Sequence, residues 1–134
     1  MYAVTEKKLL TKKGFDSLRA SDKFRILFSS IGLPLGIPNN LTDFAQLAQS
    51  KQGKNQWGSS PEALTEIRNA LVHPEKENII EDSQALFQAW NLLLWYLELS
   101  LLFLCGHKGT YANRLVLGHS VRTVEPVPWT KGEP

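Results

Sequence analysis

The chain has 134 residues, of which 43% are hydrophobic and 21% are charged; this composition excludes a largely disordered chain and predicts a single domain with a buried core. Its only cysteine, Cys105, excludes an internal disulfide and a cysteine-based zinc site. Because Cys105 lies in the apolar run LELSLLFLCG, we expect its thiol to be buried and inert, in a protein of the reducing cytoplasmic compartment.

The net charge of +2 is distributed unevenly along the chain. Residues 1–60 contain nine Lys or Arg and four acidic residues, a balance of +5, whereas residues 61–134 contain six and nine, a balance of −3. A basic half is compatible with a polyanionic partner, although a solvated surface is the more common explanation. The N-terminal sequence MYAVTEKKLLTKKG lacks an apolar region, so we expect no signal peptide.

The first half of the chain predicts a basic lead-in and two helices. Residues 1–16 form the lead-in, in which residues 4–11 could make a short helix. Over about residues 16–31 apolar side chains recur at spacings of three and four, which predicts an amphipathic helix that the loop GLPLGIP ends. The next helix is predicted to begin near Asn40, a suitable N-cap. Its apolar face consists of Leu41, Phe44, Ala45 and Ala48.

A third helix is predicted over residues 60–73. Ser60 is a suitable N-cap and Pro61 suits the first helical position. Because the residue before a proline avoids the α region, Pro74 should end this helix near residue 73. Its core stripe is predicted to be Leu64, Ile67 and Leu71.

The longest apolar segment predicts a fourth helix over residues 82–105, capped by Asp82 or Ser83 and stopped by Gly106. It is long enough to span a membrane. However, four polar side chains fall near one line of the helix, and a glutamate in mid-helix is costly in lipid. These side chains are Gln84, Gln88, Asn91 and Glu98. We therefore predict burial on several sides in a bundle or a dimer, and no membrane partner.

The segment beyond Gly106 is mixed in composition. A short helix is plausible over residues 111–117, and PVPW at 126–129 predicts an extended piece. The whole chain reads as an all-α fold, a bundle of four to five helices with an irregular C-terminal tail. We divide it into the basic lead-in, a helical domain over residues 17–129 and a tail over 130–134.

The segment RNALVH groups an arginine, an amide and a histidine near the predicted end of the third helix. Asn69 and His73 are four residues apart and share a face nearly opposite the core stripe. Arg68 lies about 140° from His73 on an ideal helix. Arginine offers a fork of donors to a phosphate, and histidine exchanges a proton near neutral pH, a combination that suits metal-free RNA cleavage. The alternative is a solvated helix end whose Arg and His bond only to carbonyl groups.

Two further side chains, Tyr111 and Arg114 in TYANR, have two interpretations. They could bind RNA phosphate or line one cleft with the RNALVH segment; alternatively, Tyr111 could pack on the core while Arg114 pairs with an acidic residue. His107 and His119 are too isolated to predict a metal site, and we predict no metal and no cofactor. The chain contains no P-loop, Gly-x-Gly-x-x-Gly or Gly-x-Ser-x-Gly motif, which argues against kinases, dehydrogenases and hydrolases.

RNALVH, on a helix followed by a long apolar helix, resembles the Arg-Asn-x-x-x-His signature of the HEPN superfamily (higher eukaryote and prokaryote nucleotide-binding domains). YANRL followed by VEPVPW resembles the end of ApeA-like bacterial HEPN domains. The resemblance covers roughly residues 17–129. In the family an Arg is followed after four to six residues by a His, and this chain matches at the short end.

The resemblance implies a helical bundle that pairs as a homodimer, with two copies of the motif forming one composite, metal-independent endoribonuclease site. His73 would act as acid and base, Arg68 as the cation at the phosphate, and Asn69 as the orienting group, leaving 2′,3′-cyclic phosphate ends on RNA. Such proteins serve as toxins or anti-phage and abortive-infection effectors, so an antitoxin or a sensor protein is a candidate partner. The alternative is a non-catalytic HEPN module for dimerisation, or for binding a nucleotide or a partner protein.

Overall fold

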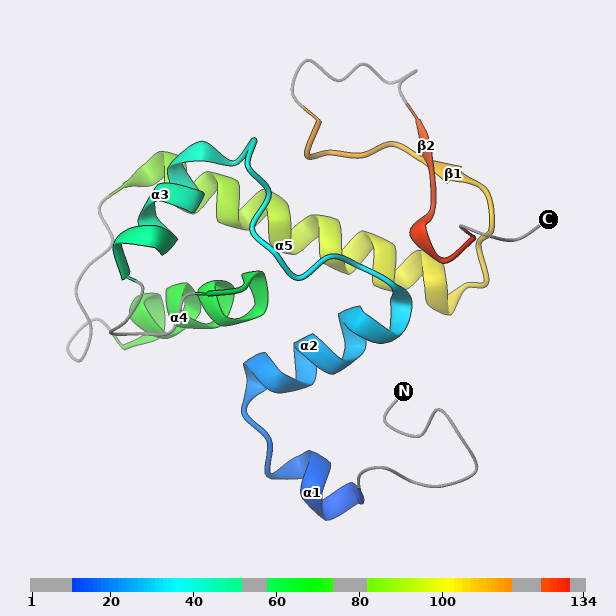
Figure 1. Ribbon diagram of the computed structural model, residues 1–134, viewed down its shortest axis with the longest axis horizontal. Coiled ribbons are helices and arrows are strands. Elements are labelled where there is room, and N and C mark those ends of the chain that lie inside the picture. The colour runs from blue at the N-terminus through cyan, green and yellow to red at the C-terminus, as the bar shows by residue number, and fades with distance from the viewer. Residues whose placement is uncertain (1–10, 52–57, 74–81, 117–123, 131–134) are drawn as a thin grey trace.

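The computed structural model describes residues 11–51, 58–73, 82–116 and 124–130. These ranges contain five helices, a pair of two-residue strands and a short 3-10 helix, so the predicted all-α bundle with an irregular tail is confirmed (Figure 1). The helices are α1 (Lys12–Asp16), α2 (Ala20–Ile31), α3 (Thr42–Lys51), α4 (Ser60–Val72) and α5 (Ser83–Leu104). The antiparallel strands are β1 (Thr110–Tyr111) and β2 (Glu125–Pro126), and η1 (Pro128–Thr130) follows them.

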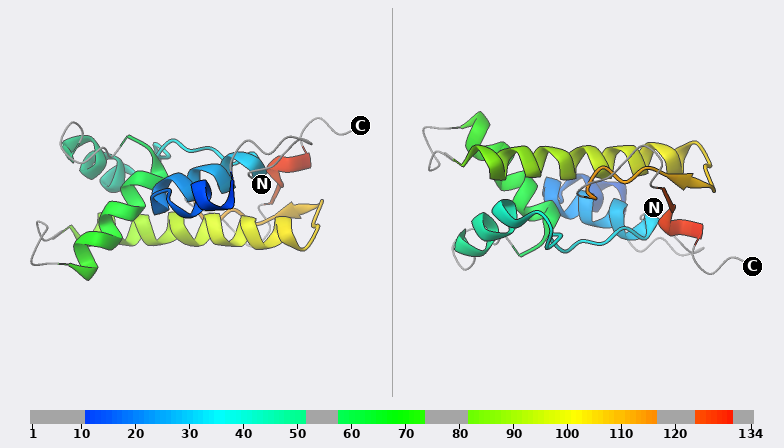
Figure 2. Two further views of the ribbon diagram at one scale, coloured as in Figure 1. Left: turned by 90° about the horizontal axis from the view of Figure 1, so that it is seen from below. Right: turned by 90° about the horizontal axis from the view of Figure 1, so that it is seen from above.

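The long helix α5 is the axis of the fold. Figure 2 shows α2 and α3 on one side of α5, and α4 crossing it with its C-terminal end projecting past α5 toward the other side. The core fills the space that these helices enclose. The largest side chains that it buries completely are Tyr96, Phe44, Ile31, Leu92, Leu99 and Val127.

The start and the end of α5 lie where the sequence predicts them. The Asp82 side chain accepts hydrogen bonds from the backbone N–H groups of Gln84 and Ala85, each at 3.1 Å, and so caps the helix. Gly106 follows the helix with a φ of +74°, a left-handed conformation that favours glycine. Cys105, the residue between α5 and this glycine, is exposed, so the prediction of a buried thiol is wrong. The apolar run continues beyond the part of α5 that the core covers.

Helix α4 begins at Ser60 with Ser59 as its N-cap, one residue before the predicted cap. The Ser60 hydroxyl is buried and instead donates a hydrogen bond to the Gly36 carbonyl at 2.9 Å. The predicted end is confirmed, because His73 leaves the helical region with φ −126° and ψ 63°.

The core face of α4 differs from the predicted stripe. Ile67 is buried and Leu64 packs against the core, as predicted, but Leu71 is 60% exposed. The small side chains of Ala63 and Ala70 are buried instead. The reason is that the last turn of α4 projects past α5, where there is no core for Leu71 to enter (Figure 2).

The helix predicted over residues 111–117 is wrong over its described part, 111–116. Tyr111 pairs with Glu125 in the β1–β2 ladder. The Asn113 side-chain oxygen then accepts the backbone N–H of Leu115 at 2.8 Å, which closes a local turn that competes with helix formation.

The N-terminal part of the described chain contains α1 and α2, and the sequence predicts here a short helix over residues 4–11 and a helix over about residues 16–31. The short helix considered over residues 4–11 lies, up to residue 10, outside the described residues. The end of the lead-in forms α1, which the Thr11 side chain caps by accepting the Gly14 N–H at 3.0 Å. Helix α2 begins at Ala20, later than predicted, and ends at Gly32, whose φ is +89°.

Candidate functional site

The last two turns of α4 carry the Arg-Asn-x-x-x-His motif. The Arg68 guanidinium is exposed and donates a hydrogen bond from Nη1 to the Asn69 side-chain oxygen at 3.2 Å. His73 is the C-cap of the helix, where its backbone N–H donates to the Asn69 carbonyl at 2.8 Å and its side chain is exposed. The structure therefore brings Arg68 and Asn69 together and places His73 one turn further, at the projecting end of the helix.

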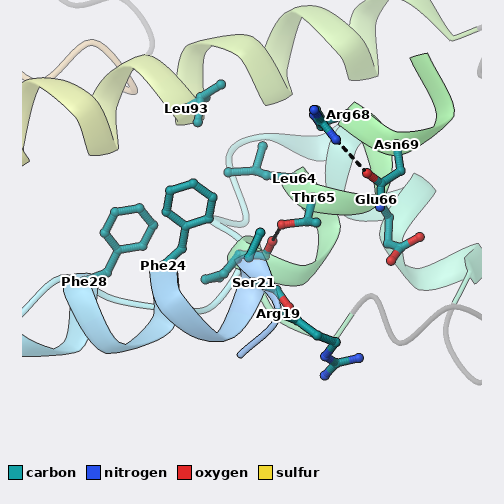
Figure 3. A pocket seen from close by; sticks show the side chains of 12 residues that line it. Arg19, Ser21, Phe24, Phe28, Leu64, Thr65, Glu66, Arg68, Asn69 and Leu93 are labelled. Carbon is teal, nitrogen blue, oxygen red and sulfur yellow. Dashed lines mark hydrogen bonds between the residues drawn. The ribbon is translucent and has the colours of Figure 1, made fainter. Parts of the chain in front are cut away.

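Arg68 and Asn69 also line a pocket of about 660 Å³ between α2, α4 and α5 (Figure 3). Its apolar walls are Phe24, Phe28, Pro61, Leu64 and Leu93. Its other lining residues are Arg19, Ala20, Ser21, Thr65, Glu66, Arg68 and Asn69. An apolar pocket with a few polar groups at its edge is the common form of a small-molecule site. His73 does not belong to the residues that line it.

A column of aromatic rings ends at this pocket. The rings of Phe24 and Phe28 are 5.7 Å apart with an interplanar angle of 13°, and those of Phe28 and Tyr96 are 4.0 Å apart at 3°. The inner rings are anchored: Phe28 is buried, and the Tyr96 hydroxyl donates to the Pro34 carbonyl at 2.7 Å. Phe24, the outermost ring, is 41% exposed. The sequence marks Phe24 only as one apolar residue of an amphipathic helix, so sequence reasoning missed its place at the pocket.

The two arginines at the pocket are held differently. Arg19 lies at the N-terminal end of α2, where its Nε is 3.4 Å from an Asp22 carboxylate oxygen. Arg68 donates to the neutral amide of Asn69, a partner that does not offset its positive charge. An arginine has five N–H donors, so this one bond leaves donors for a bidentate contact with phosphate.

Tyr111 and Arg114 lie away from this pocket, in the tail that packs beside α5. The Tyr111 ring is buried, and its hydroxyl accepts from Trp95 Nε1 at 3.2 Å and donates to Glu125 at 2.5 Å. Burial, followed by the hydrogen bond to Glu125, raises the pKa of the Tyr111 hydroxyl well above its usual range. Arg114 pairs with Glu98. The core-packing interpretation of these side chains thus describes their contacts, and their contact with RNA stays a prediction.

The side of α5 that faces away from the core exposes several large apolar side chains. We call it the outer face of α5, and define it by Phe87, Trp90, Leu94, Leu97, Leu101 and Leu104. All of these except the half-buried Leu94 are more than half exposed. Their spacings alternate between three and four, which forms one continuous stripe along the helix. By length and composition alone α5 could cross a membrane, although its other face is buried in the core.

The polar side chains of the motif are the candidates for chemistry. In the ranges that the structure describes, no group of three His, Cys, Asp or Glu side chains gathers as metal ligands would. What the arrangement offers is one guanidinium held by an amide, an imidazole at a helix end and an aromatic pocket. These groups can bind a phosphate, exchange a proton and stack on a planar ligand.

The fold and site define a small all-α domain with a polar motif beside an exposed apolar helix face. The chain belongs to the YopA C-terminal domain family, whose model matches residues 1–125. It is 29% identical over 130 residues to the SPbeta prophage-derived uncharacterized protein YopA of Bacillus subtilis (strain 168). The match covers 96% of this chain but only 28% of that relative's length. No solved structure matches the chain.

Proposed function

We propose that this domain is a metal-independent endoribonuclease of the HEPN type, which acts in the cytoplasm as a homodimer. The observation that supports this is the position of the motif. Arg68, Asn69 and His73 lie on the end of α4 that projects past α5, beside the exposed outer face of that helix (Figure 2). A second copy packed on the outer face would therefore meet the motif.

The outer face of α5 is suitable for pairing with a second copy. A continuous stripe at alternating spacings of three and four is the pattern by which two helices interlock. The five large apolar side chains that are more than half exposed give on the order of 600 Å² per copy. A stable interface buries roughly 800 Å² per partner. The outer face thus supplies most of that area, and Leu71 and Val72 at the end of α4 add exposed apolar surface beside it.

The chemistry assigns one role to each motif residue. The His73 imidazole takes the proton of a ribose 2′-hydroxyl, and the 2′-oxygen bonds to phosphorus. The bond from phosphorus to the 5′-oxygen breaks, and the protonated imidazole of the second copy gives its proton to that oxygen. Arg68 stabilises the charge on the phosphate oxygens, and Asn69 orients the guanidinium by the hydrogen bond described above. The products carry 2′,3′-cyclic phosphate and 5′-hydroxyl ends.

The prophage origin in the name of the Bacillus subtilis relative fits a role in conflict between phage and host. We extend this to the chain as a role of toxin or anti-phage effector, with an antitoxin or a sensor protein as its regulator. The polar motif then acts on RNA, and the partner controls access to it.

The test is the cleavage of a mixed RNA pool by the purified protein in EDTA. We expect the wild-type protein to leave 2′,3′-cyclic phosphate ends, and His73→Ala to lower the rate by about 100-fold or more, as loss of a general acid–base group does. The matched control is His107→Ala, because His107 bonds to the Thr110 carbonyl in the tail and lies outside the motif. Cleavage that persists in His73→Ala would overturn the proposal, and so would a wild-type protein that leaves all RNAs intact.

One observation favours a second candidate. His73 lies outside the pocket that Arg68 and Asn69 line, so the motif could bind without catalysing. The domain would then be a non-catalytic HEPN module that serves for dimerisation, or for binding a nucleotide or a partner protein. A stable dimer that leaves RNA intact, with or without the His73 substitution, would favour this candidate.

A further inference from the structure

We propose that the pocket between α2, α4 and α5 is a nucleobase subsite, in which the base stacks on Phe24 and the phosphate of the same nucleotide binds Arg68. This deepens the proposed function, and it rests on that function for RNA as the source of the nucleotide. Nothing in the motif itself assigns a role to Phe24, which lies on a different helix.

The ring column is the first observation. Three nearly parallel rings, Phe24, Phe28 and Tyr96, follow one another from the pocket into the core. The inner two are buried, so they hold the column in place, whereas the outermost ring keeps 41% of its surface exposed. A planar base placed on Phe24 would become the fourth member of the column. Stacking of this kind accepts any base, because every base has a π-face.

The second observation is the position of the cation relative to this ring. Figure 3 shows Leu64 between Phe24 and Arg68, with Leu93 of α5 on the opposite wall. A base on Phe24 would thus lie between the Leu64 and Leu93 side chains, and its sugar and phosphate would extend toward Arg68. The amide of Asn69 fixes the guanidinium from the side.

The size and polarity of the pocket select among ligands. A volume of about 660 Å³ is within the usual range for a site that holds a small molecule. A purely apolar ligand would make no use of the Arg68 guanidinium, and a free phosphate ion would make no contact with the ring column or the apolar walls. A nucleotide would contact the apolar walls with its base and Arg68 with its phosphate. The Thr65 hydroxyl at the pocket donates to the Pro61 carbonyl at 2.7 Å, so it is left as an acceptor for a donor on the edge of the base.

The experiment measures binding of AMP and UMP to the full chain carrying His73→Ala, so that catalysis does not interfere. Adenosine and ribose 5-phosphate are the probes that lack the phosphate and the base. We expect upfield ring-current shifts of the Phe24 ring protons on adding either nucleotide, and an affinity at least tenfold above that of ribose 5-phosphate, the size of one base stack.

Three substitutions in that protein separate the two halves of the site. Phe24→Leu should weaken AMP binding roughly tenfold, and Phe24→Tyr, which keeps the ring, should retain it. Arg68→Ala should weaken AMP binding while leaving the affinity for adenosine unchanged. Phe103→Leu is the matched control, since Phe103 is 38% exposed and packs edge-on against Trp129 in the tail.

The proposal is overturned if neither nucleotide binds better than ribose 5-phosphate, or if Phe24→Leu binds AMP as well as the parent protein does. This outcome is distinct from failure of the ribonuclease. If nucleotide binding depends on Phe24 but the protein cleaves no RNA, the nucleobase subsite stands and the ribonuclease proposal is rejected. RNA cleavage with no nucleotide binding at Phe24 would do the reverse.

Discussion

Two sides of the same helix, α5, are treated in opposite ways by the rest of the chain. On the polar side, three of the four side chains of the stripe have a partner from another element: Gln88 bonds to α3, and Asn91 and Glu98 bond to Arg114 of the tail. On the outer face, five of the six apolar side chains are more than half exposed. The polar stripe thus joins α5 to α3 and to the tail within one chain, whereas the outer face stays largely exposed.

The polar side shows how the chain satisfies groups that would otherwise be costly to bury. The Gln88 side chain accepts the backbone N–H of Phe44 at 2.9 Å and donates to Asp43 at 3.1 Å, which ties the start of α3 to α5. Arg114, from the tail, reaches Glu98 and the Asn91 side-chain oxygen. The stripe that argues against a membrane span in the sequence therefore has its explanation inside one chain.

The largest effect is expected from a pair of leucines two residues apart on α5. Leu99 is completely buried and Leu97 is 52% exposed on the outer face. Leu99→Ala should lower the free energy of unfolding by about 2–5 kcal/mol, because it leaves a cavity in the core. Leu97→Ala should change it by less than about 1 kcal/mol in dilute protein, where the chain is monomeric. Urea denaturation measures both values.

This pair also sharpens the contrast between the two sides. The stability of the wild-type protein should rise with protein concentration, since association stabilises the folded chain, and Leu97→Ala should weaken that rise. If Leu97→Ala and Leu99→Ala lowered the free energy of unfolding equally at low concentration, the outer face would be covered within one chain. The two sides of α5 would then not differ.

A smaller effect is expected where the tail packs beside α5. Tyr111→Phe removes the hydroxyl that joins Trp95 to Glu125, which should lower the free energy of unfolding by roughly 1–3 kcal/mol.

The raised pKa of the same hydroxyl should make the stability of the protein depend on pH in the alkaline range. Burial, with the hydrogen bond to Glu125, raises the pKa of folded Tyr111 above the value of about 10 in the unfolded chain. The folded chain therefore holds this proton where the unfolded chain has lost it, so the contribution of Tyr111 to stability should be constant below about pH 10 and fall above it. Tyr111→Phe should show a shallower alkaline fall, though not a flat one, because burial also raises the pKa of Tyr96. An unchanged alkaline slope would contradict the buried position of the hydroxyl.

The sequence predicts the parts of the fold that depend on local signals. Asp82 and Gly106 mark the ends of α5 through capping and a left-handed turn, and the proline after His73 marks the end of α4. Burial is less predictable. Leu71 fits the apolar period of α4 but lies beyond the edge of the core. Cys105 is exposed because the apolar run of α5 extends past the residues that pack against the core. Periodicity predicts which face of a helix is apolar, but it does not predict how much of that face another element covers.

The candidate site is predictable only in part, for the same reason. The spacing of Arg68, Asn69 and His73 draws attention to the end of α4, because three functional side chains within six residues are visible in the sequence itself. Phe24 and Arg68 line the same pocket although they are 44 residues apart in the chain, and only the packing of α2 against α4 brings them together. The tail could not be assigned either, since the pairing of Tyr111 with Glu125 is a long-range contact.

The measurement that tests the central claim most directly is the mass of the protein by sedimentation equilibrium at micromolar concentration, for wild type and for Leu97→Glu. We predict that the wild-type protein has twice the chain mass of 15.1 kDa. Leu97→Glu should have the single-chain mass and unchanged helix content by circular dichroism, because a charge at an exposed position blocks an apolar interface without entering the core. A wild-type protein that sediments at 15.1 kDa throughout, or a Leu97→Glu protein that still pairs, would contradict the assignment of the outer face of α5 as the contact between two copies.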